Sequence, residues 1–289
     1  MSTPSAIATV ATTATTVAPV GVFDSGLGGL SVLRAVRAQL PDESFVYVAD
    51  SRNAPYGPRD EAFITERTLA IGEWLVQQGA KALVVACNTA TSQSIAAVRE
   101  RLAIPLVGVE PGIKPAAAVS ASGIAGVLAT QATLRSARFQ ALLDRYGAGC
   151  RFICQPGHGL VEAVERGDTN SPALRALLDG YLQPMLDAGA DTLVLGCTHY
   201  PFLTETIRDI VGDRLAIVDT SDAIARQLAR VLDERGLRAP AGTRAARPRF
   251  CSTSDGRQLH ALASTLLGLD APVESVTISS PRAHACAAA

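Results

Sequence analysis

Residues 193–202 read LVLGCTHYPF: an apolar run ends abruptly in a cysteine, and a threonine, a histidine and a proline that can open a helix follow. Residues 83–92, LVVACNTATS, repeat the pattern, with an amide and hydroxyl side chains after the cysteine. Continuous apolar runs are typical of strands buried on both faces, as in parallel sheets covered by helices. The two cysteines, Cys87 and Cys197, are separated by about the length of one small domain. We therefore expect one cysteine at the end of a buried strand in each half of the chain.

Short apolar runs alternate with longer segments of helical spacing. The predicted strands are residues 20–24, 45–50, 82–87, 105–110, 124–130, 151–155, 192–197, 215–219 and 249–253. Helical spacing with charged faces marks residues 60–79, 133–145, 171–189 and 222–236. This order of elements predicts an α/β fold with mainly parallel sheets.

A domain boundary is predicted at residues 110–116, EPGIKPA, where proline and glycine interrupt the pattern, and a second crossing is predicted near residues 218–222. The predicted domains are residues 20–110 with 220–271, and residues 111–219. The two cysteine-ended strands then face one another across a cleft. Ligands of open α/β sheets bind outside the carboxyl ends of strands, which is where both cysteines are expected.

The two ends of the chain lack the alternation of apolar runs and helical segments. Residues 1–19 are rich in Ala and Thr, and they lack the positive start and apolar core of a signal peptide. We expect them to be a disordered extension, and residues 272–289 a disordered tail in which His284 and Cys286 have no role. No segment supplies the ~18 apolar residues of a membrane helix. A cytoplasmic protein without a membrane partner is expected.

The composition is that of an ordinary soluble enzyme, with 48% hydrophobic residues, 18% charged residues and a net charge of −1. Nucleic-acid-binding proteins typically have a positive net charge or a basic surface patch, so no nucleic-acid partner is expected. The 6 cysteines lack CxxC spacing in a long chain, which favours reduced thiols over a disulfide scaffold. The 4 histidines do not pair with them at zinc-finger spacing, and no metal site is predicted.

Residues 23–36, FDSGLGGLSVLRAV, form a strand, a glycine-rich turn and a helix start. The dinucleotide fingerprint G-x-G-x-x-G is not met, because Ser31 stands in the third glycine position. The glycines more simply allow a tight turn and a close approach of backbone. Asp24 and Ser25 would then direct a carboxylate and a hydroxyl into the cleft, although Ser25 could instead only cap the next helix.

A polar loop, residues 49–57 (ADSRNAPYG), follows another predicted strand. Loops at this edge of a sheet often carry function, and here Tyr56 could offer a hydroxyl and Gly57 a backbone N–H. The alternative is an ordinary connecting loop. Three other cysteines are interpreted as small buried hydrophobic residues: Cys150, Cys154 and Cys251.

Cys87 and Cys197 differ because each precedes polar residues at a predicted helix start. The helix dipole and unpaired N–H groups there lower the pKa of a thiol from ~8.5 and favour the thiolate. The same N–H groups form a carboxylate-binding cradle. The side chains that would complete this cradle are Asn88, Thr89, Thr198 and His199.

Two thiols on opposite sides of an anion site suit the inversion of a carbon stereocentre. One face of the carbon needs a base and the other needs an acid, and a thiolate opposite a thiol supplies both. The two sulfurs exchange roles when the other enantiomer binds. Asp24 and His199 are predicted to assist. A pyridoxal mechanism would need a Schiff-base lysine, and neither Lys81 nor Lys114 is suitably placed, so no cofactor is predicted.

The chain resembles the cofactor-independent glutamate racemases of bacterial cell-wall synthesis, within the aspartate/glutamate racemase superfamily. Six ordered motifs between about Val20 and Ser254 carry the resemblance: GVFDSGLGGLSVL, YVADSRNAPYG, VVACNTATS, VGVEPGIKPA, VLATQATLRS and LGCTHYPFL. The resemblance implies two pseudosymmetric, doubly wound α/β domains with the active site between them. It also implies that Cys87 acts on D-glutamate and Cys197 on L-glutamate, with the product D-glutamate supplied to peptidoglycan.

The resemblance implies a set of substrate contacts at matching positions: Asp24, Ser25, Tyr56, Gly57, Asn88, Thr89, Thr130, Thr133, Thr198 and His199. Glu162, in HGLVEAVERGD, lies near a family acidic residue that assists close to His199. The expected partner is the small-molecule substrate. A homodimer is compatible with the sequence, which sets no oligomeric state.

Three alternatives stay open. The same chemistry could act on aspartate or another small amino acid, because sequence does not define pocket size. The chain could be a ligand-binding protein without activity. A metal hydrolase could use Cys87, Cys197 and His199, although zinc sites want three or four supported ligands and a carboxylate cradle better explains the Thr and Asn residues.

Overall fold

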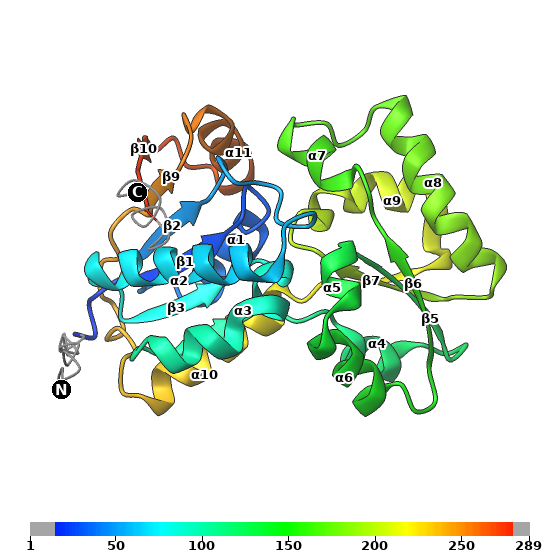
Figure 1. Ribbon diagram of the computed structural model, residues 1–289, viewed down its shortest axis with the longest axis horizontal. Coiled ribbons are helices and arrows are strands. Elements are labelled where there is room, and N and C mark those ends of the chain that lie inside the picture. Colours follow the sequence, from blue (N-terminus) through cyan, green and yellow to red (C-terminus); the bar gives the residue numbers. More distant parts are fainter. Residues whose placement is uncertain (1–14, 280–289) are drawn as a thin grey trace, which may run out of the picture.

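The computed structural model describes residues 15–279 and divides them between two parallel sheets that lie side by side (Figure 1). Residues 1–14 and 280–289 lie outside the described residues, and with them His284, Cys286 and most of the predicted N-terminal extension. The α/β fold class with mainly parallel sheets is confirmed, since every strand pairing in the described part of the chain is parallel.

The first sheet has the strand order β10-β9-β2-β1-β3-β4. Its strands are β1 (Val20–Asp24), β2 (Phe45–Ala49), β3 (Ala82–Val85), β4 (Leu106–Gly108), β9 (Arg249–Ser252) and β10 (Val273–Ser275). The helices of this unit are α1 (Leu30–Gln39), α2 (Glu61–Gln77), α3 (Asn88–Arg101), α10 (Ser221–Glu234) and α11 (Arg257–Leu267). Strands β1, β2 and β3 are buried along their whole length, which explains why their sequences are continuously apolar.

The second sheet has the order β6-β5-β7-β8. Its strands are β5 (Ile124–Ala129), β6 (Arg151–Pro156), β7 (Thr192–Gly196) and β8 (Ala216–Val218). Its helices are α4 (Ile113–Val119), α5 (Gln131–Arg135), α6 (Ala137–Tyr146), α7 (Leu160–Glu165), α8 (Pro172–Asp187) and α9 (Thr204–Val211), with the short 3-10 helices η1 (Tyr200–Leu203) and η2 (Gly212–Arg214).

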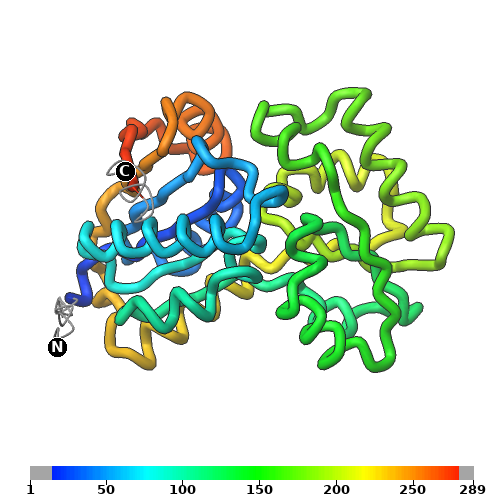
Figure 2. Tube along the Cα trace, viewed as in Figure 1, coloured from blue at the N-terminus to red at the C-terminus, as the bar shows by residue number. Residues whose placement is uncertain are grey.

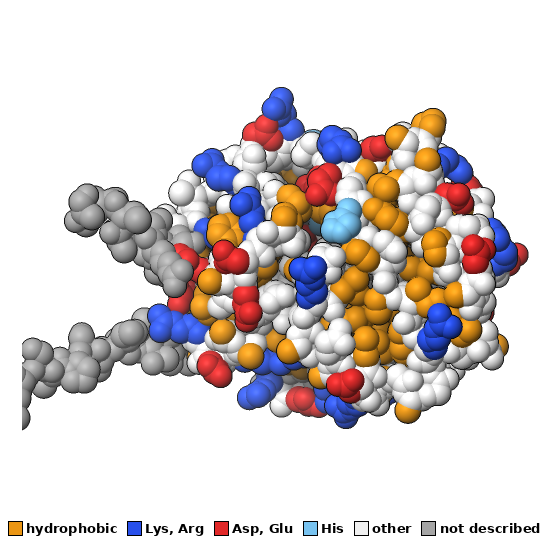
Figure 3. Space-filling model, turned by 45° about the vertical axis from the view of Figure 1, so that its right-hand side comes forward, with side chains coloured by type: hydrophobic (Ala, Val, Ile, Leu, Met, Phe, Trp, Pro, Cys, Tyr) orange, Lys and Arg blue, Asp and Glu red, His pale blue; other side chains and the backbone are white. Residues whose placement is uncertain are grey.

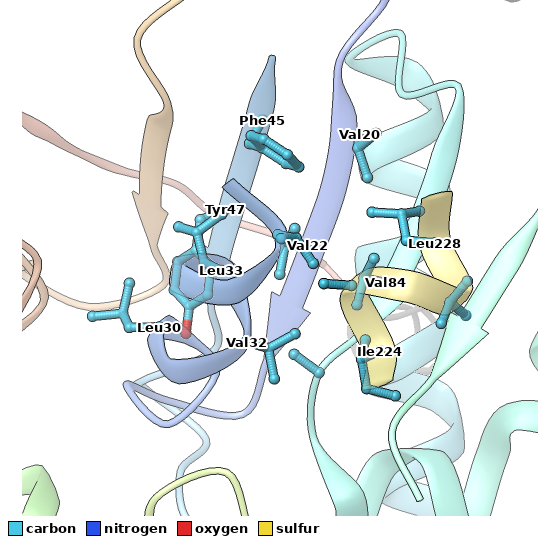
Figure 4. Packing of buried hydrophobic residues seen from close by; sticks show 14 of the residues in the cluster. Val20, Val22, Leu30, Val32, Leu33, Phe45, Tyr47, Val84, Ile224 and Leu228 are labelled. Carbon is cyan, nitrogen blue, oxygen red and sulfur yellow. The ribbon is translucent and has the colours of Figure 1, made fainter. Parts of the chain in front are cut away.

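Apolar side chains cover both faces of the first sheet. On one face, Val22 and Val84 of the strands pack in one cluster with Leu228 of α10, together with residues of α1 and α11 (Figure 4). On the other face, α2 and α3 form a second cluster with the strands. Each fully buried Leu or Val side chain contributes about 1.5–3 kcal/mol relative to exposure, so these clusters hold the carboxyl ends of the strands in place.

The chain passes between the two sheets twice, at residues 109–112 and at residues 219–220 (Figure 2). The helix α10 is thereby returned to the first sheet, where it packs against α1. These passages overlap the segments 110–116 and 218–222, where the sequence predicted crossings, and the domain bounds themselves stay a prediction. On the face drawn in Figure 3, Lys and Arg side chains are scattered among Asp and Glu, and apolar side chains gather between them.

Two expectations were wrong. The segment after residue 271 is not disordered at its start, because β10 pairs in parallel with β9 and Val276 N donates to Ser252 O at 2.8 Å. A three-residue edge strand of mixed polarity carries too weak a pattern to be recognised from sequence. Cys154 is exposed on the edge strand β6 rather than buried, whereas Cys150 and Cys251 are buried as expected.

Candidate active site

The two cysteines lie at the carboxyl ends of central strands, one in each unit. Cys87 follows β3 and caps the start of α3, and Cys197 follows β7 just before η1. Both side chains are buried, with exposed fractions of 5% and 6%. The carboxyl edges of the two sheets therefore meet at one place, as expected for a ligand site in this architecture.

A cavity of about 480 Å³ lies between the two units and is lined by both cysteines. Most of the other predicted site residues line it too: Ser25, Tyr56, Gly57, Asn88, Thr89, Thr130, Glu162, Thr198 and His199. Asp24 and Thr133 do not line the cavity but are fully buried behind it. Two exposed arginines that the sequence analysis did not single out, Arg59 and Arg135, also line it, and their charges favour an anionic ligand.

Cys87 lies in an environment that favours the protonated thiol. Its sulfur accepts a hydrogen bond from Ala90 N at 3.4 Å, as expected at a helix start, and its S–H donates to Ser25 Oγ at 3.5 Å. Burial, and next the charge of Asp24, nevertheless raise the pKa of the Cys87 thiol to about 12. The expectation that the helix start would lower this pKa was wrong, because the loss of hydration outweighs the helix N–H groups.

Cys197 lies beside a histidine instead. Its sulfur is 3.7 Å from His199 Nδ1, and His199 Nε2 is 2.6 Å from Glu165 Oε1. Burial lowers the pKa of His199, but hydrogen bonds to Cys197 and Glu165 outweigh it and hold this pKa well above its ordinary value. A positively charged imidazole beside the sulfur stabilises a negative charge there. The two cysteines therefore differ in their electrostatic surroundings.

Glu165, and not Glu162, is the acidic partner of His199. Burial raises the pKa of Glu165, but the hydrogen bond and charge of His199 outweigh it and hold the pKa below its ordinary value. Glu162, one turn earlier on α7, is exposed and lines the cavity without contacting His199. Both residues stand in the motif HGLVEAVERGD, and residues one turn apart share a helix face, so the motif alone did not distinguish them.

The glycine-rich turn brings the two units into close contact. A Cβ at Gly26 would lie 2.0 Å from Glu165 Oε1, and a Cβ at Gly28 would lie 2.4 Å from His199 Nδ1. Leu27 N donates to Glu165 Oε1 at 2.8 Å. The predicted close approach of backbone is thus made to side chains of the second unit.

Asp24 supports the site from behind the cavity. Its Oδ1 accepts from Gly26 N at 2.8 Å, and its Oδ2 accepts from Thr198 Oγ1 at 2.9 Å across the two units. Burial raises the pKa of Asp24, and the charge of His199 offsets part of that rise. In this structure Asp24 orients Thr198 and the turn.

The Tyr56 hydroxyl is directed away from the cavity. It donates to Asp50 Oδ2 at 2.7 Å, so it is committed to that carboxylate. Burial, and next the charge of Asp50, hold the pKa of Tyr56 well above its ordinary value. What Tyr56 and Gly57 present to the cavity is therefore an aromatic ring and loop backbone, not the predicted hydroxyl.

Amide and hydroxyl groups gather on the remaining wall. Asn88 is buried, and its Nδ2 donates to no group in the described part of the protein. Thr89 Oγ1 and Thr130 Oγ1 are 2.9 Å apart across the two units, and Thr130 Oγ1 donates to Thr133 Oγ1 at 2.9 Å. A buried donor without a partner is costly, so Asn88 indicates a ligand with an acceptor oxygen at this wall.

Among residues 15–279, no cluster of three or more His, Cys, Asp and Glu side chains could hold a metal ion. Within the same range, no helix is both long and apolar enough to cross a membrane.

Comparison with known proteins gives the family. Residues 29–228 match the family described as Asp/Glu/Hydantoin racemase. The chain belongs to this racemase family. A glutamate racemase of Ralstonia nicotianae is 60% identical over 256 residues, which cover 89% of this chain and 91% of the relative. A glutamate racemase of Ralstonia pickettii is 57% identical, covering 91% of this chain and 96% of the relative.

Solved structures agree with this membership. Escherichia coli glutamate racemase in complex with L-glutamate and the activator UDP-MurNAc-Ala superimposes with a TM-score of 0.80 at 34% identity, covering 91% of this chain and 100% of that one. The glutamate racemase isoform RacE1 of Bacillus anthracis has a TM-score of 0.80 at 31% identity, covering 90% of this chain and 98% of that one. The predictions of an amino-acid racemase and of the glutamate racemase resemblance are confirmed.

Proposed function

We propose that this racemase interconverts L-glutamate and D-glutamate by proton transfer between Cys87 and Cys197, without a cofactor. The observation that carries the proposal is that two buried cysteines from different units open onto one cavity. The substrate is supported by the relatives, which are glutamate racemases, and by the bound L-glutamate of the Escherichia coli structure.

Starting from L-glutamate, Cys197 as thiolate removes the proton from Cα, and the Cys87 thiol donates its proton to the opposite face. The carbon is inverted, and Cys87 is left as thiolate, ready to act on D-glutamate. The surroundings favour this starting state, because His199 stabilises a charge on Cys197 while the raised pKa keeps Cys87 protonated. Glu165 holds His199 in orientation.

The walls of the cavity bind and orient the substrate. Asn88 Nδ2 is suited to the α-carboxylate, since it is a neutral donor on the cavity wall that has no partner in the described part of the protein. The Thr198 hydroxyl already donates to Asp24, and the Thr89 hydroxyl is paired with Thr130. The loop at Tyr56 and Gly57 is suited to the side-chain carboxylate through its backbone. Because Cα–H is a very weak acid, fixed dipoles in a closed cavity must stabilise the negative charge that develops.

The same proposal assigns the enzyme to the cytoplasm as a homodimer that supplies D-glutamate for peptidoglycan. The cytoplasmic location agrees with the two-thiol mechanism, because a reducing compartment keeps both thiols unoxidised. Sedimentation or light scattering of the purified protein would test the dimer, and a mass of one chain would contradict it.

The function is tested by incubating the protein with L-glutamate in D₂O without added cofactor, following circular dichroism and Cα deuterium by NMR. Loss of optical activity with deuterium entering the product is expected. If aspartate responds and glutamate does not, the mechanism stands and the substrate is wrong. If no amino acid responds, the protein is a binding protein or requires an activator, and the proposal in this form fails.

A further inference from the structure

A buried carboxylate links the Tyr56 loop to the C-terminal part of the chain. Asp50, directly after β2, is fully buried and accepts hydrogen bonds from Tyr56 Oη at 2.7 Å and from Thr253 Oγ1 at 2.9 Å. Arg67 of α2 binds the same carboxylate with two nitrogens, Nε at 3.0 Å and Nη2 at 2.9 Å. A bidentate arginine fixes the direction of a carboxylate, so Asp50 holds Tyr56 in one position.

Arg67 also binds the segment that follows β10. Its Nη1 donates to the backbone oxygen of Ile278 at 2.6 Å. Ile278 is 8% exposed and belongs to the same apolar cluster as Tyr56 and Cys87. Residues 276–278 therefore pack behind the loop that forms one wall of the cavity.

We propose that residues 276–278 act as a positioning strap for the substrate loop: Ile278 holds Arg67, Arg67 holds Asp50, and Asp50 holds Tyr56 and Gly57 in the substrate-binding position. The inference rests on the proposed role of this loop in binding glutamate. Arg67 and the strap touch no substrate and act only through the loop.

The first test compares two truncated chains, one ending at Ser275 and one ending at Ser279. Removal of the strap should raise KM for L-glutamate and for D-glutamate by about tenfold, the change expected when one buried hydrogen bond no longer orders the loop, with kcat little changed. The chain ending at Ser279 is the matched control, and its KM should equal that of the full chain. Equal KM values in the two truncated chains, both folded by circular dichroism, would overturn the proposal.

A second variant covers the case in which the shorter chain does not fold. Arg67→Lys keeps a positive charge beside Asp50, but lysine has a single side-chain nitrogen and lacks the separate nitrogen with which Arg67 binds Ile278 O. We expect KM to rise in the same direction in the full-length protein. A folded Arg67→Lys variant with unchanged KM would contradict the strap.

A double-mutant cycle separates the strap from a general loss of stability. In Tyr56→Phe the hydrogen bond from Tyr56 to Asp50 is already absent, so removal of residues 276–278 should add little to KM. If the truncation raises KM by the same factor with Tyr56 and with Phe at this position, the two changes act independently. The strap would then only stabilise the fold. If the full chain does not racemise glutamate, the proposed function fails. If the full chain is active and the truncated and substituted variants have the same KM as the full chain, only the strap proposal fails.

Discussion

Glu165 Oε1 lies 2.6 Å from His199 Nε2 and also accepts the hydrogen bond from Leu27 N of the other unit. One carboxylate thus orients the histidine beside Cys197 and holds the glycine-rich turn against it. The closed arrangement of the two units and the electrostatic surroundings of one proposed catalytic cysteine depend on the same group.

Replacement of either proposed catalytic cysteine is expected to abolish racemisation in both directions. Cys87→Ala and Cys197→Ala each remove one of the two proton carriers, and a positioned acid or base is worth about 10²–10⁴-fold. Optical rotation from each pure enantiomer measures the loss. Cys154→Ser, at an exposed cysteine outside the cavity, is the control and should retain full activity. Racemisation that persists without Cys87 or Cys197 would exclude the two-base mechanism.

Glu165→Gln should lower kcat/KM by roughly 10- to 100-fold, as expected for a lost hydrogen bond between charged groups. The loss should be equal in the two directions, because the enantiomers have equal free energies in solution. Initial rates with L- and D-glutamate measure it. Glu162→Gln, one turn away and exposed, is the matched control. A larger loss in Glu162→Gln than in Glu165→Gln would reverse the assignment of the histidine's partner.

The Glu165–His199 pair should make stability depend on pH within a defined window. The raised pKa of His199 contributes stability that is complete below its ordinary value of 6.5 and is lost as pH rises through the folded-state pKa. The lowered pKa of Glu165 contributes stability present above its ordinary value of 4.5 and lost as pH falls through the folded-state pKa. The difference in free energy of unfolding between the native protein and Glu165→Gln should therefore be largest between pH 4.5 and 6.5.

Urea titrations at several pH values measure this difference. A difference that keeps growing from pH 6.5 to 9 would show that the charge on His199 does not stabilise the fold.

Gly28→Ala should impair activity strongly, because the added Cβ would lie 2.4 Å from His199 Nδ1 and 2.5 Å from Thr198 Oγ1. Those side chains must move, or the two units must separate. Gly180→Ala on α8 is the control: it meets no atom within 4 Å and should stabilise the helix by about 0.5–1 kcal/mol. Activity assays together with thermal unfolding distinguish the two variants. Normal activity in Gly28→Ala would show that the close approach is not required.

Local patterns were sufficient for the architecture. Continuous apolar runs predicted the central strands β1, β2, β3 and β7, because a strand buried on both faces needs apolar residues at consecutive positions. The crossing at residues 110–116 was predicted from the proline and glycine residues that interrupt the pattern there. The strand β10 was missed, because three residues at a sheet edge have no such constraint.

The sequence by itself determined that this is a two-sheet α/β racemase and that Cys87 and Cys197 stand at strand ends, since those properties follow from residue order and motifs. Only the tertiary structure decided which side chains meet. It selected Glu165 over Glu162 for His199, committed the Tyr56 hydroxyl to Asp50, and buried Cys87 deeply enough to raise its pKa. Some of these contacts join residues more than 100 positions apart, such as Leu27 with Glu165 and Asp24 with Thr198. Others, such as Tyr56 with Asp50, join close neighbours in the sequence, but the direction and burial of the side chains depend on the packing around them, which no local pattern encodes.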